Sequence, residues 1–147
     1  MKKYLQKKLN NEKGMTLIEL LAVIVIIAII AAIAIPAIST IIENSRHGAV
    51  KADYQNALAA ANLHFTENPS DDIADFTELS VYLDDPGSLL DVSVTKVANG
   101  NTIDGTAEAN ENYYDVDDSP TNAELSDLSN AEFGTNYPGT APVTPVN

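Results

Sequence analysis

The chain has 147 residues, enough for one domain, and 21 acidic against 8 basic residues give it a formal net charge of −13. Such a surface repels phosphate, so direct nucleic-acid binding is not expected. The chain contains no cysteine. This excludes a disulfide framework, so the fold must be held by packing, hydrogen bonds or a metal ion.

The chain begins with a basic leader, residues 1–14, which ends in Gly14 and carries a single acid, Glu12. An apolar run follows from Leu17 to Ile35. As a helix, these roughly 19 residues rise about 28 Å, which matches a hydrocarbon core of about 30 Å. The lysines before the run place the leader in the cytoplasm and the rest of the chain outside. These lysines are Lys2, Lys3, Lys7, Lys8 and Lys13.

Two residues in this region are unusual for a plain membrane span. Glu19 is a carboxylate within an apolar helix, where a charge is costly unless it has a partner. Cleavage after Gly14 would supply one, because the new α-amino group of Met15 would lie one helical turn away on the same face. Pro36 cannot donate a hydrogen bond to the carbonyl of Ala32, so we predict a kink or local opening there.

The run Gly14-Met15-Thr16-Leu17-Ile18-Glu19, with the apolar stretch and Pro36 after it, resembles the class III signal of type IV pilins and related pseudopilins. In that family a membrane peptidase cuts after the glycine and methylates the new N-terminal residue. The resemblance implies cleavage between Gly14 and Met15, N-methylation of Met15, and a role for Glu19 in filament assembly. The family more often has Phe where Met15 stands. The resemblance covers about a third of the chain.

The leader also suggests a source. The residues Asn11-Glu12-Lys13-Gly14, together with the absence of cysteine, resemble Gram-positive members of the family. Removal of residues 1–14 takes away five lysines and one glutamate, so the net charge of the mature chain becomes −17.

Two other interpretations of the N-terminal region stay open. A conventional secretory signal could be cut at the A-x-A-like site formed by residues 32–34, and a plain membrane anchor would not be cut at all. Neither interpretation explains the spacing between Gly14 and Glu19, whereas the pilin resemblance does.

The helix is expected to continue beyond residue 43 as the spine of a small head. Apolar residues recur there at spacings of three and four, which predicts one buried stripe. Asn68-Pro69 should end the helix, which then covers about residues 15–66. His47 and His64 have no companion ligands at metal spacing and are interpreted as surface or packing residues. The stripe consists of Val50, Tyr54, Ala57, Leu58, Ala61 and Phe65.

After this helix we predict a small antiparallel sheet with short helices. Residues 70–85 should form a loop with a short helix capped by Asp75 and Glu78, and Asp85-Pro86-Gly87 should form a turn. Alternating valines predict a strand over residues 92–97. Residues 102–109 and 112–116 are interpreted as the next two strands.

The sequence of the C-terminal region predicts one more helix and contains carboxylates that are candidate ligands for a cation. Thr121 and Glu124 form a capping box for a helix over residues 121–129. Proline and glycine exclude regular helix from Gly134 onward, so the tail should be extended or mobile. Asp115, Asp117 and Asp118 are weak calcium candidates. Because they do not fit an EF-hand loop, we expect a solvated turn and no cofactor.

These features predict an α+β protein with the type IV pilin fold. It comprises a leader (1–14), a transmembrane and filament-core helix (15–42) and a globular head (43–147). No residues form a catalytic constellation. The predicted function is that of a non-enzymatic subunit, the major pilin, of a type IV pilus serving adhesion, twitching motility or DNA uptake.

The resemblance also implies partners and location. The partners are further copies of the chain in a helical polymer, the prepilin peptidase, the assembly platform, the extension ATPase and the membrane. The precursor would be a single-pass membrane protein and the assembled pilus extracellular. One rival is a pseudopilin of a competence or type II secretion filament, and the other is a membrane-anchored surface protein that never polymerises.

Overall fold

The computed structural model describes the backbone of residues 2–140 and the side chains of residues 16–140. The chain divides into two compact units, Met1–Ile41 and Ile42–Asn147. A single helix, α1 (Lys2–Glu67), contributes to both units. It ends one residue from the predicted position, where the backbone N–H and the side-chain amide of Asn68 both donate to the carbonyl of His64. The long helix is therefore confirmed, and it also includes most of the leader.

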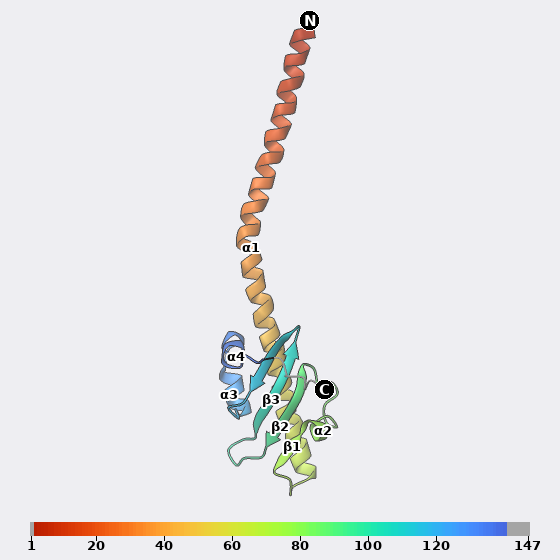
Figure 1. Cartoon of the computed structure of the whole chain (residues 1–147), viewed down its shortest axis with the longest axis vertical. Coiled ribbons are helices and arrows are strands. Elements are labelled where there is room, and N and C mark those ends of the chain that lie inside the picture. Colours follow the sequence, from red (N-terminus) through yellow and green to blue (C-terminus); the bar gives the residue numbers. More distant parts are fainter. Residues whose placement is uncertain (1, 141–147) are drawn as a thin grey trace, which may run out of the picture. The chain divides into compact units, whose positions relative to one another are not determined.

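The second unit contains a four-stranded antiparallel sheet in the order β1-β2-β3-β4 (Figure 1). Its strands are β1 (Ile73–Asp75), β2 (Leu89–Thr95), β3 (Thr102–Ala109) and β4 (Asn112–Val116). The bounds of β3 and β4 agree with the predicted strands. The strand predicted over residues 92–97 begins earlier and stops at Thr95, so Val97 lies outside it. β1 was not predicted, because residues 70–85 were interpreted as a loop with a short helix.

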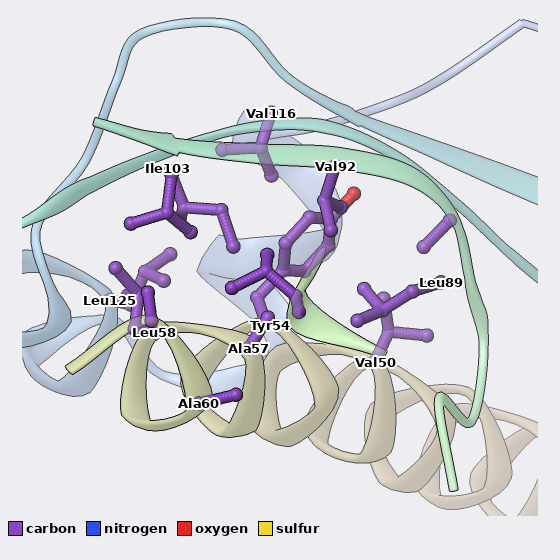
Figure 2. Close-up of a cluster of buried hydrophobic side chains, with 14 of the residues drawn as sticks. Val50, Tyr54, Ala57, Leu58, Ala60, Leu89, Val92, Ile103, Val116 and Leu125 are labelled. Carbon is purple, nitrogen blue, oxygen red and sulfur yellow. The ribbon is translucent and has the colours of Figure 1, made fainter. Parts of the chain in front are cut away.

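The apolar stripe of α1 is buried in the core of the head, as predicted. Its six residues are each 7% exposed or less, and they pack with inward-facing residues of the strands (Figure 2). In Figure 2, Val50, Tyr54 and Leu58 rise from the helix toward Val92 and Ile103 of the sheet. The apolar residues at spacings of three and four on the helix therefore pack against the alternate, inward-facing residues of the strands, and together they form one core.

Tyr54 fixes the helix against the middle of the sheet. Its hydroxyl donates to the carbonyl of Gly105 at 2.9 Å, and burial, reinforced by the charge of Asp115, raises its pKa well above the usual value. Gly105 has a φ of +142°, and a Cβ there would lie 2.2 Å from the carbonyl oxygen of Asp91. Only glycine allows β2 and β3 to approach this closely.

Three short helices begin with capping boxes. α2 (Phe76–Leu79) has Asp75 as N-cap and Glu78 as its partner, and α3 (Asn122–Asp127) has Thr121 and Glu124, so both predicted boxes are confirmed. The predicted turn at residues 85–87 also forms, with Gly87 at a φ of +61° and its N–H donating to Asp85 at 2.9 Å.

The third short helix corrects a prediction. α4 (Asn130–Asn136) includes Gly134, where regular helix was excluded. A capping box of Ser129 and Glu132 starts this helix. The ring of Phe133 is fully buried, with its centroid 6.0 Å from that of Tyr114. This tertiary burial outweighs the low helix propensity of glycine.

The chain after α4 is extended beside β4. Tyr114 and Pro138 form an isolated antiparallel bridge, and the N–H of Gly139 donates to the carbonyl of Tyr113 at 2.8 Å. Of the two alternatives predicted for the tail, extended or mobile, this agrees with the extended one. Residues 141–147 of the predicted tail lie outside the described residues.

Candidate membrane and assembly segment

The first described part of α1 has an exposed, apolar surface. We call residues 16–42 the apolar segment. Its large aliphatic side chains are 47–71% exposed, and this part of α1 is long and apolar enough to cross a membrane. A helix that is apolar on all sides needs an apolar environment on all sides. The exposed side chains are Leu17, Ile18, Leu20, Leu21, Val23, Ile24, Val25, Ile26, Ile27, Ile29, Ile30, Ile33, Ile35, Ile38, Ile41 and Ile42.

Glu19 is the single charged residue of the apolar segment. It is exposed, and among residues 16–140 no basic side chain lies within ion-pair distance of it. Met15 precedes it by four residues in α1, so the two backbone positions are about one turn apart on the same face. The side chain of Met15 lies outside the described ones. The arrangement places a carboxylate that has no ion-pair partner among residues 16–140 close to the predicted new N-terminus.

The helical backbone continues on both sides of Pro36. Just after it, two side-chain hydroxyl groups donate hydrogen bonds to backbone carbonyls four residues earlier. Ser39 donates to the carbonyl of Ile35 and Thr40 to the carbonyl of Pro36, each at 3.1 Å. Such bonds hide polar groups in an apolar environment and favour slight bending of a helix. The proline therefore does not end the helix, and the kink itself stays a prediction.

The structure also places the weak metal candidates. Asp115, Asp117 and Asp118 are all exposed, and the described side chains do not bring their carboxylates together into a group of three ligands. The expectation of no cofactor is not tested by this observation. A different group does come together, His64, Asp71 and Glu78, which the sequence did not indicate. The chain reverses at Asn68-Pro69, and only that reversal brings Asp71 and Glu78 to the histidine.

Comparison with known families supports the N-terminal interpretation. Residues 9–35 match the family profile described as the prokaryotic N-terminal methylation motif. A comparison with curated proteins gave no match, and neither did a comparison with solved structures. The matched residues cover Gly14, Met15 and Glu19 and most of the exposed apolar helix.

Together, the motif and the helix support one interpretation of the N-terminal region. They support a class III signal of the kind found in the type IV pilin family, on a pilin-like or pseudopilin-like precursor. The motif implies that prepilin peptidase and pilus assembly machinery process the chain, and that the precursor inserts in the membrane by a single helix. It also implies a structural subunit rather than an enzyme.

Proposed function

We propose that the chain is the major structural subunit of a type IV pilus and has no catalytic activity of its own. The observation that carries this proposal is the coincidence of the methylation motif, residues 9–35, with a helix that is apolar on every side. A membrane covers such a surface before assembly. In a filament, copies of the same helix take the place of the lipid.

The first step is processing of the membrane precursor. The peptidase removes residues 1–14 by cutting between Gly14 and Met15, and it then methylates the amino group of Met15. Glycine has no side chain to obstruct the peptidase. The positive charges of the lysine-rich leader hold the N-terminal end of the helix at the cytoplasmic face of the membrane, and loss of the leader removes this constraint.

The second step is addition of the subunit to the filament. Glu19 of an incoming subunit is attracted to the Met15 amine of a subunit already in place. In a dry filament core this pair is far stronger than in water, and an unpaired charge there is costly. The pair therefore selects one axial register. The assembly platform and extension ATPase supply the work of lifting the subunit out of the bilayer.

Pro36 gives the apolar segment a place to bend as the helices pack. Pro36→Ala restores the missing backbone donor and should straighten and stiffen the helix without affecting cleavage. Filament yield and stiffness, compared with the wild type, measure its role. If the variant formed filaments with the yield and stiffness of the wild type, the proline would not be needed for packing.

The head forms the outer surface of the filament. Its acidic residues carry nearly all of the −17 charge of the mature chain, so successive heads attract cations and repel nucleic acid. Adhesion, twitching motility and DNA uptake are the processes such a pilus serves, with other subunits making any contact with DNA.

Intact-mass analysis of sheared surface material and of the membrane fraction tests the proposal. We expect both fractions to contain a chain that begins at Met15 and carries one methyl group, and long fibres in the sheared fraction. As a control, Gly14→Leu should keep residues 1–14 and stay in the membrane. Chains beginning at Met1 or Ile35 in the surface material would contradict the proposal. Correct processing without long fibres would instead indicate a pseudopilin.

A further inference from the structure

We propose that His64, Asp71 and Glu78 form a binding site for a zinc ion at the end of α1. One potential ligand atom from each of these residues lies within 4.8 Å of the other two. The three residues come from different parts of the head: the last turn of α1, the loop after it, and the first turn of α2. An ion bound there would link these three segments to one another.

His64 provides the strongest argument for a ligand. Its side chain is 6% exposed, and its Nε2 atom makes no hydrogen bond in the described structure. Nε2 nevertheless lies 3.3 Å from Oδ2 of Asp71. A buried imidazole nitrogen that makes no hydrogen bond is unfavourable, because the hydrogen bonds it made to water have not been replaced. A metal ion next to Nε2 would satisfy it.

The distance between the two atoms suits zinc. Ligands about 2.0–2.1 Å from a tetrahedral ion are about 3.3 Å from each other, so the Nε2–Oδ2 distance matches one edge of such a site. In that geometry the carboxylate oxygen lies off the axis of the nitrogen lone pair. An off-axis position of this kind would account for the short Asp71–Nε2 distance without a hydrogen bond.

The surrounding residues hold two of the ligands in place. The imidazole ring of His64 makes T-shaped contacts with the rings of Phe65 and Tyr82, whose centroids lie 5.5 and 6.0 Å from its own. Glu78 is fixed by the capping box, in which its Oε2 accepts from the N–H of Asp75 at 3.0 Å. A carboxylate has further lone pairs, so Glu78 can bind an ion while keeping this bond.

The chemistry of the donors favours zinc over calcium. One imidazole and two carboxylates are common zinc ligands, and the two negative charges balance the ion. Calcium instead takes six to eight oxygen ligands, which this group does not offer. Asp71 is half-exposed and Glu78 exposed, so the ion can enter from solvent and a water molecule can complete its coordination.

Calorimetric titration of the full chain in detergent with zinc chloride at neutral pH tests the site. We expect one zinc ion per chain. Asp71→Asn and Glu78→Gln should each weaken binding by about tenfold or more, because each removes a charged ligand. Glu78→Gln still permits the capping box, so its loss of affinity would not reflect an unfolded α2.

Asp72→Asn is the matched control. Asp72 is the neighbour of Asp71 in sequence, its side chain is exposed, and it does not belong to the ligand group, so the variant removes the same charge without removing a ligand. It should bind zinc as the wild type does. Equal weakening by Asp71→Asn and Asp72→Asn would show diffuse attraction to an acidic surface and overturn the proposal. Absence of zinc binding by the wild type would also overturn it and leave His64 and Asp71 as an ion pair only.

Discussion

The two halves of α1 share one secondary structure but have opposite surroundings. In residues 16–42 the large aliphatic side chains are about half exposed or more, whereas the stripe from Val50 to Phe65 is buried against the sheet. The first half is apolar on every side, and the second has apolar residues on one face only. The distribution of apolar residues around a helix, rather than their number, thus decides whether its partner is the protein's own sheet or an external apolar environment.

The difference also separates folding from assembly. The second half is stabilised within the chain, by burial against β2, β3 and β4 and by bonds such as that from Lys51 to the carbonyl of Leu128 at 2.8 Å. The large aliphatic side chains of the first half are exposed, and under the proposed function lipid or other copies of the chain would bury them. Substitutions in the two halves should therefore fail in different assays.

A matched pair of leucine substitutions tests this separation and has the largest expected effect on stability. Leu58 is 2% exposed and Leu21 is 57% exposed. Leu58→Ala should cost the head about 3 kcal/mol through lost burial and a cavity, while Leu21→Ala should leave the head unchanged. Thermal unfolding in detergent, followed by the near-ultraviolet circular dichroism of the tyrosines in the head, measures both.

The same pair should behave in the opposite way at the apolar segment. Leu21→Ala removes contact area from the filament core, so its filaments should be easier to dissociate than those of the wild type. Destabilisation of the head by Leu21→Ala, as large as that caused by Leu58→Ala, would contradict the division of α1 into two halves.

A second pair concerns the close approach of β2 and β3 beneath the buried half of α1. Gly105→Ala should cost about 2–3 kcal/mol, because the backbone has a positive φ and the new Cβ would collide with Asp91. Gly100 also has a positive φ, +122°, but its nearest neighbour would be 3.8 Å away. Gly100→Ala should therefore cost only about 1 kcal/mol. Equal costs in chemical denaturation would show that the strands do not approach as closely as described.

Much of this fold could be predicted from local sequence patterns. The long helix, the stripe and the strands at residues 102–109 and 112–116 follow from regular periodicity over eight or more residues or from clear turns between strands. The strand β1 has only three residues, of which Ala74 alone is buried. Its pairing with residues 93–95 of β2 depends on tertiary structure, which no local pattern records.

The missed helix and the missed ligand group have different causes. For α4, the capping residues Ser129 and Glu132 are a usable helix signal in the sequence, whereas Gly134 and the prolines after it argue against a helix. The burial of Phe133 in the core stabilises the helix despite these residues. For the group around His64, the ligands are seven residues apart along a chain that reverses direction, so their proximity depends on the fold of the loop.

The N-cap of α4 gives a smaller effect within the head. Ser129 accepts a hydrogen bond from the N–H of Glu132 at 3.3 Å. Ser129→Ala should cost about 1 kcal/mol, and Thr121→Ala at the start of α3 should cost a similar amount. Urea unfolding of the two variants checks this. An unchanged midpoint for Ser129→Ala would mean that burial of Phe133 alone maintains α4.

The smallest effect is a dependence of head stability on pH. Hydrogen bonds from Thr121 lower the pKa of Glu124, and those from Ser129 lower the pKa of Glu132, below their usual value of 4.5. Their contribution is present above pH 4.5 and is lost as the pH falls through the lowered pKa values. Glu132→Gln should show a smaller loss of thermal stability than the wild type on acidification. An equal loss would assign the pH dependence to other carboxylates.

The central claim is that the exposed half of α1 becomes a filament core guided by Glu19, and piliation by Glu19 variants tests it most directly. Glu19→Ala removes a costly charge from an apolar helix, so the variant should be cleaved and accumulate in the membrane. Glu19→Gln keeps a hydrogen-bonding group of the same size but loses the ion pair.

The measurement is the ratio of sheared to cell-associated subunit, with cleavage checked by intact mass. We predict a low ratio for both variants, with Glu19→Ala at least as defective as Glu19→Gln, and a correctly processed chain in each membrane. A wild-type ratio for Glu19→Ala would show that the carboxylate does not guide assembly and would contradict the account.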